Sequence, residues 1–274
     1  MRKKRKLHLT RHALLIFVVL ASSFVLYWSV VVASWDNSVV GEIPPKLIPG
    51  PHLIENIKRV FTESMMGKGL LNSFIVSGTV TLSVLLNSTL AGFVFAKLKF
   101  PGRDKLFGLM LATMMIPSVM GIVPLYITMV HFGWTGQLQA VIAPSLASAF
   151  GTFWVRNYLN DALPDGLLEA GRVDGCSTLR LYWHVALPTC RPVAAMLGVF
   201  TFIGTWKDLF WPLVVLNPGN PTAQTALTTL AGGRTMDFSL VMAGVAVAMF
   251  PTIIVFLFAG KWLISGIMEG AVKG

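Results

Sequence analysis

Charged side chains are scarce in this sequence, and acidic ones are the scarcest. Only 12% of the 274 residues are Asp, Glu, Lys or Arg, whereas a soluble domain has roughly a quarter. Hydrophobic residues make up 54% of the chain, and the mean hydropathy is +0.70. This composition excludes an ordinary soluble domain and indicates a membrane protein.

Several patterns of enzyme and metal sites are also missing. The two cysteines, Cys176 and Cys190, have no metal-ligand spacing around them, and we interpret them as packing residues of a loop in a reducing compartment. Paired carboxylates and His clusters on a common face are absent, so we expect no catalytic residue and no bound metal. The phosphate loop Gly-x-x-x-x-Gly-Lys-Ser/Thr is absent as well, so we expect no ATP hydrolysis by this chain.

Positive charge is in excess, with 22 Lys and Arg against 12 Asp and Glu, which gives a net charge of +10. Such a charge could suggest nucleic-acid binding. The cations, however, lie at the ends of apolar runs, as the topology of a membrane protein requires. We therefore expect contact with membrane lipid and none with nucleic acid.

The apolar runs predict an all-α membrane protein with six transmembrane helices, because a bilayer needs about 20 apolar residues per span. The first run is long and lacks a clear small-x-small cleavage site, so we interpret it as a retained span rather than a signal peptide. The runs cover residues 13–33, 70–96, 106–128, 138–158, 192–216 and 239–264.

The segments between the runs complete the predicted organisation. Six spans place both termini on one side of the membrane. The segments on that side hold 16 Lys and Arg residues against 5 on the other, which marks it as cytoplasmic. We expect a basic cytoplasmic tail (1–12), the first helix (13–33), an extracytoplasmic loop with a short helix near 53–66 (34–69), a core of five spans (70–264) with a cytoplasmic loop (159–191), and a cytoplasmic C-terminus (265–274).

Residues 169–188 are the longest polar interval between two strongly apolar runs, and their pattern predicts two short helices. Asp165 can cap the first helix, and apolar residues then repeat at helical spacing. Gly175 stands where a helix end favours the left-handed conformation. Ser177 or Thr178 can cap a second helix, which Pro188 should stop.

Prolines and small residues shape two of the predicted spans. Pro117 and Pro124 should weaken the third span and free its backbone carbonyls. In the fourth span Pro144 precedes several small residues that allow close helix packing. The 97–105 loop is a Pro-Gly turn rich in cations, and we interpret it as a topology anchor.

Lys207 and Asp208 lie near the middle of the fifth span, between Trp206 and Trp211. Ionisable groups inside a membrane are costly and normally face a bundle interior or a water-filled path. Substrate contact and a structural ion pair both fit. Neighbouring residues of a helix point about 100° apart, so the two charges should not share one pocket well. Aromatic faces beside polar groups are compatible with a sugar.

The 169–188 interval resembles the EAA motif of the membrane subunits of ATP-driven importers, which is Glu-Ala-Ala, three residues, Gly, nine residues, Ile, one residue and Leu-Pro. Here Gly171 replaces the second Ala and Val185 replaces the Ile, with every spacing kept. The alternative is an ordinary helical hairpin between membrane helices.

The likeness extends over about 70–265 and is to permeases of carbohydrate importers of the maltose-transporter type, in particular the second, G-type permease of the pair. It is carried by the following segments: Phe95-Ala-Lys-Leu-Lys-Phe-Pro-Gly-Arg103, Met115-Ile-Pro117, Val123-Pro-Leu-Tyr126 and Trp206-Lys-Asp-Leu-Phe-Trp-Pro-Leu213. One departure is Lys207, where the family usually has Asn.

The resemblance implies a type I ABC importer permease fold with cytoplasmic coupling helices. It further implies a homologous second permease, a dimer of ATPase subunits that holds ATP and Mg, and an extracytoplasmic substrate-binding protein. The residues expected to couple to the ATPase are Glu169, Ala170, Gly171, Asp174, Gly175, Leu187 and Pro188. The candidates for the substrate pathway are Trp206, Lys207, Asp208 and Trp211.

The expected function is import of a sugar or sugar derivative, through alternating access driven by closure of the ATPase. Glycerol-phosphate-like compounds and amino sugars are alternatives, because closely similar permeases carry them and Lys207 could balance a phosphate. A stand-alone secondary transporter or channel is a further alternative. It would depend on Lys207 and Asp208 as the ion site, and it would commonly show inverted repeats, of which we find none.

Overall fold

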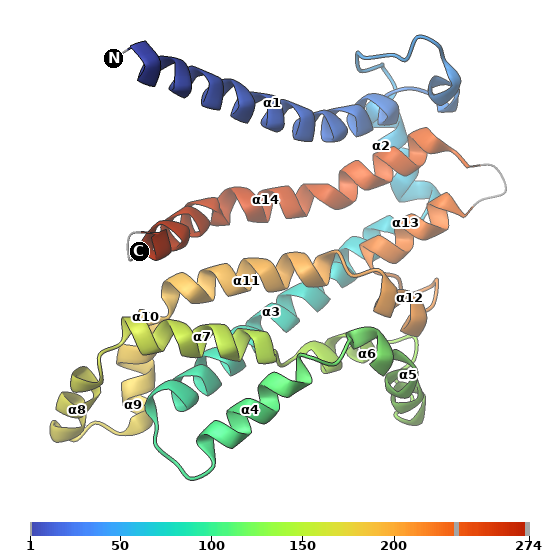
Figure 1. Ribbon diagram of the computed structural model, residues 1–274. Coiled ribbons are helices and arrows are strands. Elements are labelled where there is room, and N and C mark those ends of the chain that lie inside the picture. Colours follow the sequence, from blue (N-terminus) through green and yellow to red (C-terminus); the bar gives the residue numbers. More distant parts are fainter. Residues whose placement is uncertain (1, 233–235, 272–274) are drawn as a thin grey trace. The chain divides into compact units, whose positions relative to one another are not determined.

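The computed structural model describes residues 2–232 and 236–271, with side chains for 11–232 and 236–258. It is built of helices, and no β-strand occurs in those described ranges (Figure 1). The last three residues of the predicted C-terminal segment, 265–274, lie outside the described residues. The chain divides into two compact units, which are considered separately below.

The first unit takes its residues from Met1–Gly67 and Ala226–Phe250. Its long α1 helix contains an apolar stretch, Arg11–Ala33, with a mean hydropathy of 2.4. The predicted short helix of the first loop is present as α2. The elements that begin in this unit are α1 (Arg2–Ala33), η1 (Asn37–Gly41), α2 (Leu53–Glu63), α3 (Met66–Lys97) and α14 (Phe238–Ala271).

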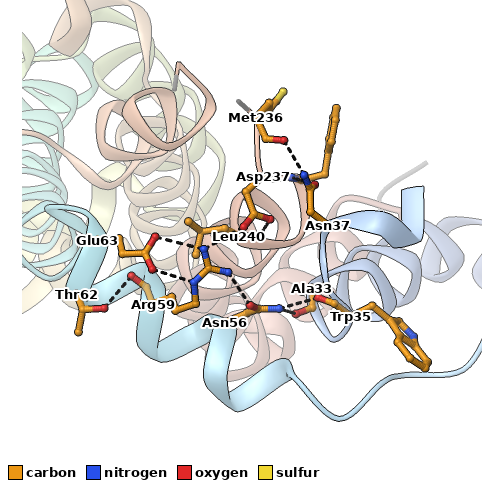
Figure 2. Close-up of polar contacts among 11 residues, drawn as sticks. Ala33, Trp35, Asn37, Asn56, Arg59, Thr62, Glu63, Met236, Asp237 and Leu240 are labelled. Carbon is orange, nitrogen blue, oxygen red and sulfur yellow. Dashed lines mark hydrogen bonds and ion pairs between the residues drawn. The ribbon is translucent and has the colours of Figure 1, made fainter. Parts of the chain in front are cut away.

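Polar contacts join α1, α2 and the start of α14 in this unit (Figure 2). The buried Asn56 amide donates hydrogen bonds to the carbonyls of Ala33 and Trp35, at 2.9 and 2.8 Å. Arg59 donates to Glu63 at 2.8 Å and to Asp237 at 3.0 Å. The other carboxylate oxygen of Asp237 accepts from the N–H of Leu240, so the same side chain caps α14.

The second unit takes its residues from Lys68–Thr225 and Pro251–Gly274. Its elements after α3 are α4 (Arg103–Thr113), η2 (Ser118–Gly121), α5 (Ile122–His131), α6 (Gln139–Ile142), η3 (Ala143–Ser145), α7 (Ala149–Ala162), α8 (Asp165–Val173), α9 (Thr178–Leu181), the π-helical η4 (Tyr182–Ala186), α10 (Leu187–Thr189), α11 (Arg191–Trp206), α12 (Phe210–Val215) and the start of α13 (Ala223–Ala231). Figure 1 shows α8 and α9 at one end of this unit, and α5, α6 and α12 at the other.

Small residues let α3 and α7 approach closely in the second unit. A Cβ atom on Gly92 of α3 would lie 2.6 Å from Cγ1 of Val155 in α7, closer than real side-chain contacts. Gly151, one of the small residues of the predicted fourth span, meets α3 at Ser88 in the same way. The close contact buries Val155 and Leu159 completely and forms the centre of the core.

In the part of the chain that the structure describes, three helices are long and apolar enough to cross a membrane: α1 from Arg11, α3, and α14 as far as Phe258. Two bent helix pairs bring the number to as many as five in the described part of the chain, if each pair is one span. The bilayer-spanning character is therefore as predicted. The count of six continuous helices is not reproduced.

Prolines explain where the predicted spans break. The 106–128 run is α4 and η2–α5, which are bent by 87°, because Pro117 adopts an extended ψ of 125° and stops the helix. The 138–158 run is divided between α6, η3 and α7. Pro144 lies in the short η3 turn, and Ser148 begins α7 anew by accepting a hydrogen bond from the N–H of Gly151 at 3.0 Å.

Candidate functional site

The polar interval predicted as two short helices folds as a helical hairpin. We call residues 165–189, which comprise α8, α9, η4 and α10, the 165–189 hairpin. Pro164 rather than Asp165 occupies the N-cap of α8, so the prediction that Asp165 caps this helix is wrong. Asp165 is the first helical residue, and its carboxylate accepts a 2.8 Å hydrogen bond from the Lys97 ammonium of α3.

Gly175 has the left-handed conformation that its position predicted, with φ of +77°. Its N–H donates to the carbonyl of Arg172 at 3.0 Å, and the N–H of Cys176 donates to the carbonyl of Gly171 at 2.9 Å. These two bonds make a Schellman motif, which satisfies the last carbonyls of α8 and reverses the chain.

Ser177 caps α9 by accepting a hydrogen bond from the N–H of Arg180 at 3.3 Å, as predicted. Pro188 does not stop this second helix, which continues through α10 to Thr189. The helix instead widens into the π-helical turn Tyr182–Ala186 before the proline. We attribute the wide turn to Pro188, which cannot donate to a carbonyl one turn earlier and whose ring needs the extra room.

The helix ends beyond Pro188, at a bend of 74° between Thr189 and Arg191. Pro192 follows in the first turn of α11, where its missing N–H costs nothing. The two cysteines lie in and beside the hairpin as free thiols, with Cys176 half-buried and Cys190 buried, which agrees with a packing role.

The inner face of the hairpin packs into the core of the second unit. Leu168, Leu181 and Tyr182 are buried there. The Tyr182 hydroxyl lies 2.8 Å from the Thr89 hydroxyl of α3. Gly171, which replaces the second Ala of the EAA motif, lies close to Leu181, since a Cβ at this position would be 2.6 Å from a terminal methyl of that side chain.

The outer face of the hairpin exposes apolar side chains on a polar stretch of chain. Val173 is 87% exposed, Leu179 62% and Leu167 52%. Of the predicted coupling residues, Glu169, Ala170, Asp174 and Gly175 are exposed, whereas Gly171, Leu187 and Pro188 are half-buried. The geometry therefore brings the first four to the surface and gives the other three packing positions.

Lys97 connects the hairpin to the end of α3. Its side chain is 5% exposed, although that of its partner Asp165 is 76% exposed. The hydrogen bond and charge of Lys97 lower the pKa of Asp165, with smaller effects from the charges of Lys99 and Arg172. The sequence assigned Lys97 only to a topology anchor and gave no sign of this partner, because 68 residues separate the two.

The second candidate site lies at a break in the chain rather than within a helix. Lys207, Asp208 and Leu209 separate α11 from α12, which corrects the prediction of one continuous span over 192–216. Pro212 explains the break, because its ring would clash with the carbonyl of Asp208 in a continuous helix. The Asp208 carboxylate accepts a 3.2 Å hydrogen bond from the N–H of Phe210, the first residue of α12.

The four pathway candidates separate into two pairs. Trp206 is 1% exposed, stacks on Phe202 and meets Phe74 edge to face, and Trp211 donates its indole N–H to the carbonyl of Ala140 at 3.0 Å. Both indoles are thus held within the protein. Lys207 is exposed and Asp208 half-buried, and no described carboxylate lies within ion-pair distance of the Lys207 ammonium.

Sequence reasoning overlooked Tyr182 and Thr89. Tyr182 lies in the nine-residue spacer of the EAA pattern and Thr89 within an apolar run, so neither spacing nor composition marks them. Groups of three or more His, Cys, Asp or Glu able to hold a metal ion are absent from the described residues.

Comparison with known proteins gives a consistent picture. Residues 88–268 match the family described as the binding-protein-dependent transport system inner membrane component. The chain is 31% identical to the sn-glycerol-3-phosphate transport system permease protein UgpE of Yersinia pestis bv. Antiqua, over 97% of this chain and 98% of the relative. It is 30% identical to the protein of the same name from Pectobacterium atrosepticum, with the same coverage.

A solved structure shows the same fold. It is a chain of a bacterial ABC transporter involved in the import of the acidic polysaccharide alginate, with a TM-score of 0.83 and 18% identity, covering 95% of this chain and 98% of the other. The relatives of the present chain are permease subunits, which are non-catalytic membrane components. The chain therefore belongs to the family of inner membrane components of binding-protein-dependent transport systems, with the fold of an ABC importer permease.

Proposed function

We propose that this chain is the transmembrane permease subunit of an ATP-driven importer of a sugar or a sugar derivative. The observation that carries the proposal is the 165–189 hairpin, a polar segment that is capped at both helices and anchored to the core. Its outer face still exposes Leu167, Val173 and Leu179. Apolar side chains on a rigid extramembrane element are typical of a docking surface, and the EAA spacing supports an ATPase subunit as the partner.

In this mechanism the hairpin is the lever that couples the ATPase to the spans. Glu169, Ala170 and Asp174 lie on the surface that would enter a cleft of the ATPase. Gly171 and Gly175 give α8 its close contact with α9 and its sharp exit, whereas Leu187 and Pro188 lead into α11. Closure of the ATPase dimer would move the hairpin as a rigid body and switch the spans from inward-open to outward-open.

The partners follow from the same proposal. This chain would pair with a homologous second permease, dock on a dimer of ATPase subunits and receive its substrate from an extracytoplasmic binding protein. ATP and Mg would bind to the ATPase, and no cofactor to this chain. The hairpin and both termini would face the cytoplasm, in agreement with the excess of Lys and Arg on that side.

The break after α11 is the proposed substrate-pathway element of this subunit. A helix that ends inside a membrane leaves free backbone carbonyls, which are tolerated beside a water-filled cavity. Lys207 and Asp208 are accessible there, whereas the buried Trp206 and Trp211 would support the element from within the protein. A glycerol-phosphate-like substrate is the second candidate, supported by the unpaired Lys207 ammonium and by the names of the curated relatives.

The test is co-purification of the tagged full-length chain with its ATPase subunit in a gentle detergent. Val173→Glu places a charge on the proposed docking face without touching the core, because Val173 is 87% exposed. We expect this variant to insert normally, to lose the ATPase from the purified complex and to lose ATP-dependent uptake.

Ile43→Glu is the matched control, since Ile43 is 96% exposed in the 34–69 loop. It should keep both the ATPase and the uptake. Recovery of the ATPase by Val173→Glu at the wild-type level, or isolation of the wild-type chain without any ATPase, would refute the docking role. A stand-alone transporter would then be the better interpretation.

A further inference from the structure

A pocket of about 460 Å³ lies where the end of α3 and the following turn meet α8. Four cationic side chains and two carboxylates are among the groups that line it, so positive charge is in excess. The charged lining consists of Lys97, Lys99, Arg103, Arg172, Asp165 and Glu169.

Two of the four cations already have partners. Lys97 pairs with Asp165 at 2.8 Å, and Arg103 pairs with Asp104 at 2.9 Å. Lys99 and Arg172 form no ion pair with any carboxylate of the described residues. They nevertheless line the same pocket, beside the carboxyl group of Asp165. The pocket therefore has two cations available to an external anion.

The pocket lies at the end of a membrane span. Lys97 is the last residue of α3, a helix of 32 residues with a mean hydropathy of 1.7. Arg103 of the pocket lining begins α4, and Leu106 and Leu109 of the same helix are 52% and 66% exposed. Gly108 lies between these two leucines in the sequence, and a Cβ atom added to it would meet open space. The helix that begins at the cationic pocket thus also carries exposed apolar side chains.

Aromatic rings support the turn that carries these cations. Phe95 of α3 contacts Phe100 of the turn at 6.0 Å and Phe107 of α4 at 5.4 Å between ring centroids. These contacts fix the 98–102 turn against both helices, so Lys99 and Arg103 project from a supported backbone. The backbone that carries these cations is therefore held in place by aromatic packing.

We propose that this pocket binds the phosphate headgroup of an anionic phospholipid, with Lys99 and Arg172 on the phosphate and an acyl chain along α4. Basic pockets at the ends of transmembrane helices are suited to anionic headgroups. A free phosphate would use the cations but not the apolar face of α4.

The experiment is native mass spectrometry of the purified full-length chain, titrated separately with dioleoyl phosphatidylglycerol and dioleoyl phosphatidylcholine. We expect tighter binding of the phosphatidylglycerol. The double variant Lys99→Gln/Arg172→Gln should lose this preference, at about fivefold in affinity for each cation removed. Lys58→Gln/Arg180→Gln is the matched control, since it removes two exposed cations outside the pocket lining and should bind as the wild type does.

Two further arms separate the lipid from other anions. Leu109→Asn should weaken phosphatidylglycerol binding while leaving the cations in place, and soluble sn-glycerol 3-phosphate should not displace the lipid at equal concentration. Displacement by the soluble phosphate would overturn the lipid assignment. So would equal binding of the two lipids by the wild type, or an unchanged preference in Lys99→Gln/Arg172→Gln, which would leave the cations as a topology anchor or as contacts for an acidic protein partner.

Discussion

The Tyr182 hydroxyl donates a hydrogen bond to the Thr89 hydroxyl at 2.8 Å and thereby joins the π-helical turn of the hairpin to the C-terminal third of α3. The direction follows from the second contact of Thr89, whose own proton points to the carbonyl of Leu85 at 2.7 Å. Both side chains are buried, and the ring of Tyr182 also contacts Phe93. A displacement of the hairpin must therefore act on α3.

We predict that Tyr182→Phe destabilises the chain by about 1 kcal/mol, because it removes one buried hydrogen bond and keeps the ring. Thr89→Val should cost a similar amount. The double variant should cost less than the sum, since both changes remove the same bond. Thermal unfolding of the four proteins in detergent measures this cycle, and strictly additive losses would contradict the bond.

Gly175→Val should abolish transport while leaving membrane insertion intact. A β-branched residue at a φ of +77° is strained by roughly 1–2 kcal/mol, so the Schellman turn should open and release α8 from its orientation. Gly166→Ala is the control, because Gly166 lies within α8 at an ordinary φ with open space around it. The control should be neutral or slightly stabilising. Membrane fractionation and substrate uptake provide the two readouts. Uptake at the wild-type level by Gly175→Val would contradict the proposal that the hairpin acts as a lever.

Lys207→Asn should distinguish the two substrate candidates. It removes the unpaired ammonium at the break after α11 and restores the amide usual in carbohydrate permeases. If the importer carries a phosphorylated polyol, we expect at least a tenfold loss of uptake, the equivalent of about 1.4 kcal/mol of lost stabilisation. Uptake of labelled sn-glycerol 3-phosphate measures this effect, with Lys58→Asn on the exposed face of α2 as the control. Unchanged phosphate uptake would exclude contact between Lys207 and the substrate.

The ion pair of Lys97 and Asp165 should make the anchoring of α8 dependent on pH. The folded-state pKa of Asp165 lies below the ordinary value of 3.8. The pair therefore stabilises the folded state above that value, and its contribution is lost as the pH falls through the lowered pKa. The effect should be small, because Asp165 is largely exposed. Hydrogen exchange of α8 between pH 6 and pH 2.5 measures it, and Asp165→Asn should abolish the difference. An equal pH dependence in Asp165→Asn would assign the change to other groups.

Local signals in the sequence were sufficient for much of the hairpin. Gly175 and Ser177 have the conformations that their positions predicted, because a left-handed helix end and an N-cap depend on a few neighbouring residues. Asp165 was predicted as a cap and became an ion-pair partner instead, since Pro164 could take the cap position and Lys97 comes from a distant helix.

The breaks in the spans show the limit of hydropathy. Apolar runs predict which residues enter the membrane, but they do not distinguish one straight helix from two bent pieces. Pro117 was predicted to weaken its span, whereas Pro212 was not singled out, and the bend of 87° at Pro117 depends on the helices packed around it. Pro188 was predicted to stop a helix and does not, since the helix widens into a π turn before it and continues.

By itself, the sequence determined the membrane character, the place of the hairpin and the family, because these depend on composition and on residue spacing. The tertiary structure alone decided that Tyr182 bonds to Thr89 and that Gly171 admits Leu181. It also decided that Lys99 and Arg172 line one pocket while Trp206 and Trp211 turn inward. These contacts join residues far apart in the chain, and their formation depends on how whole helices pack, which no local pattern records.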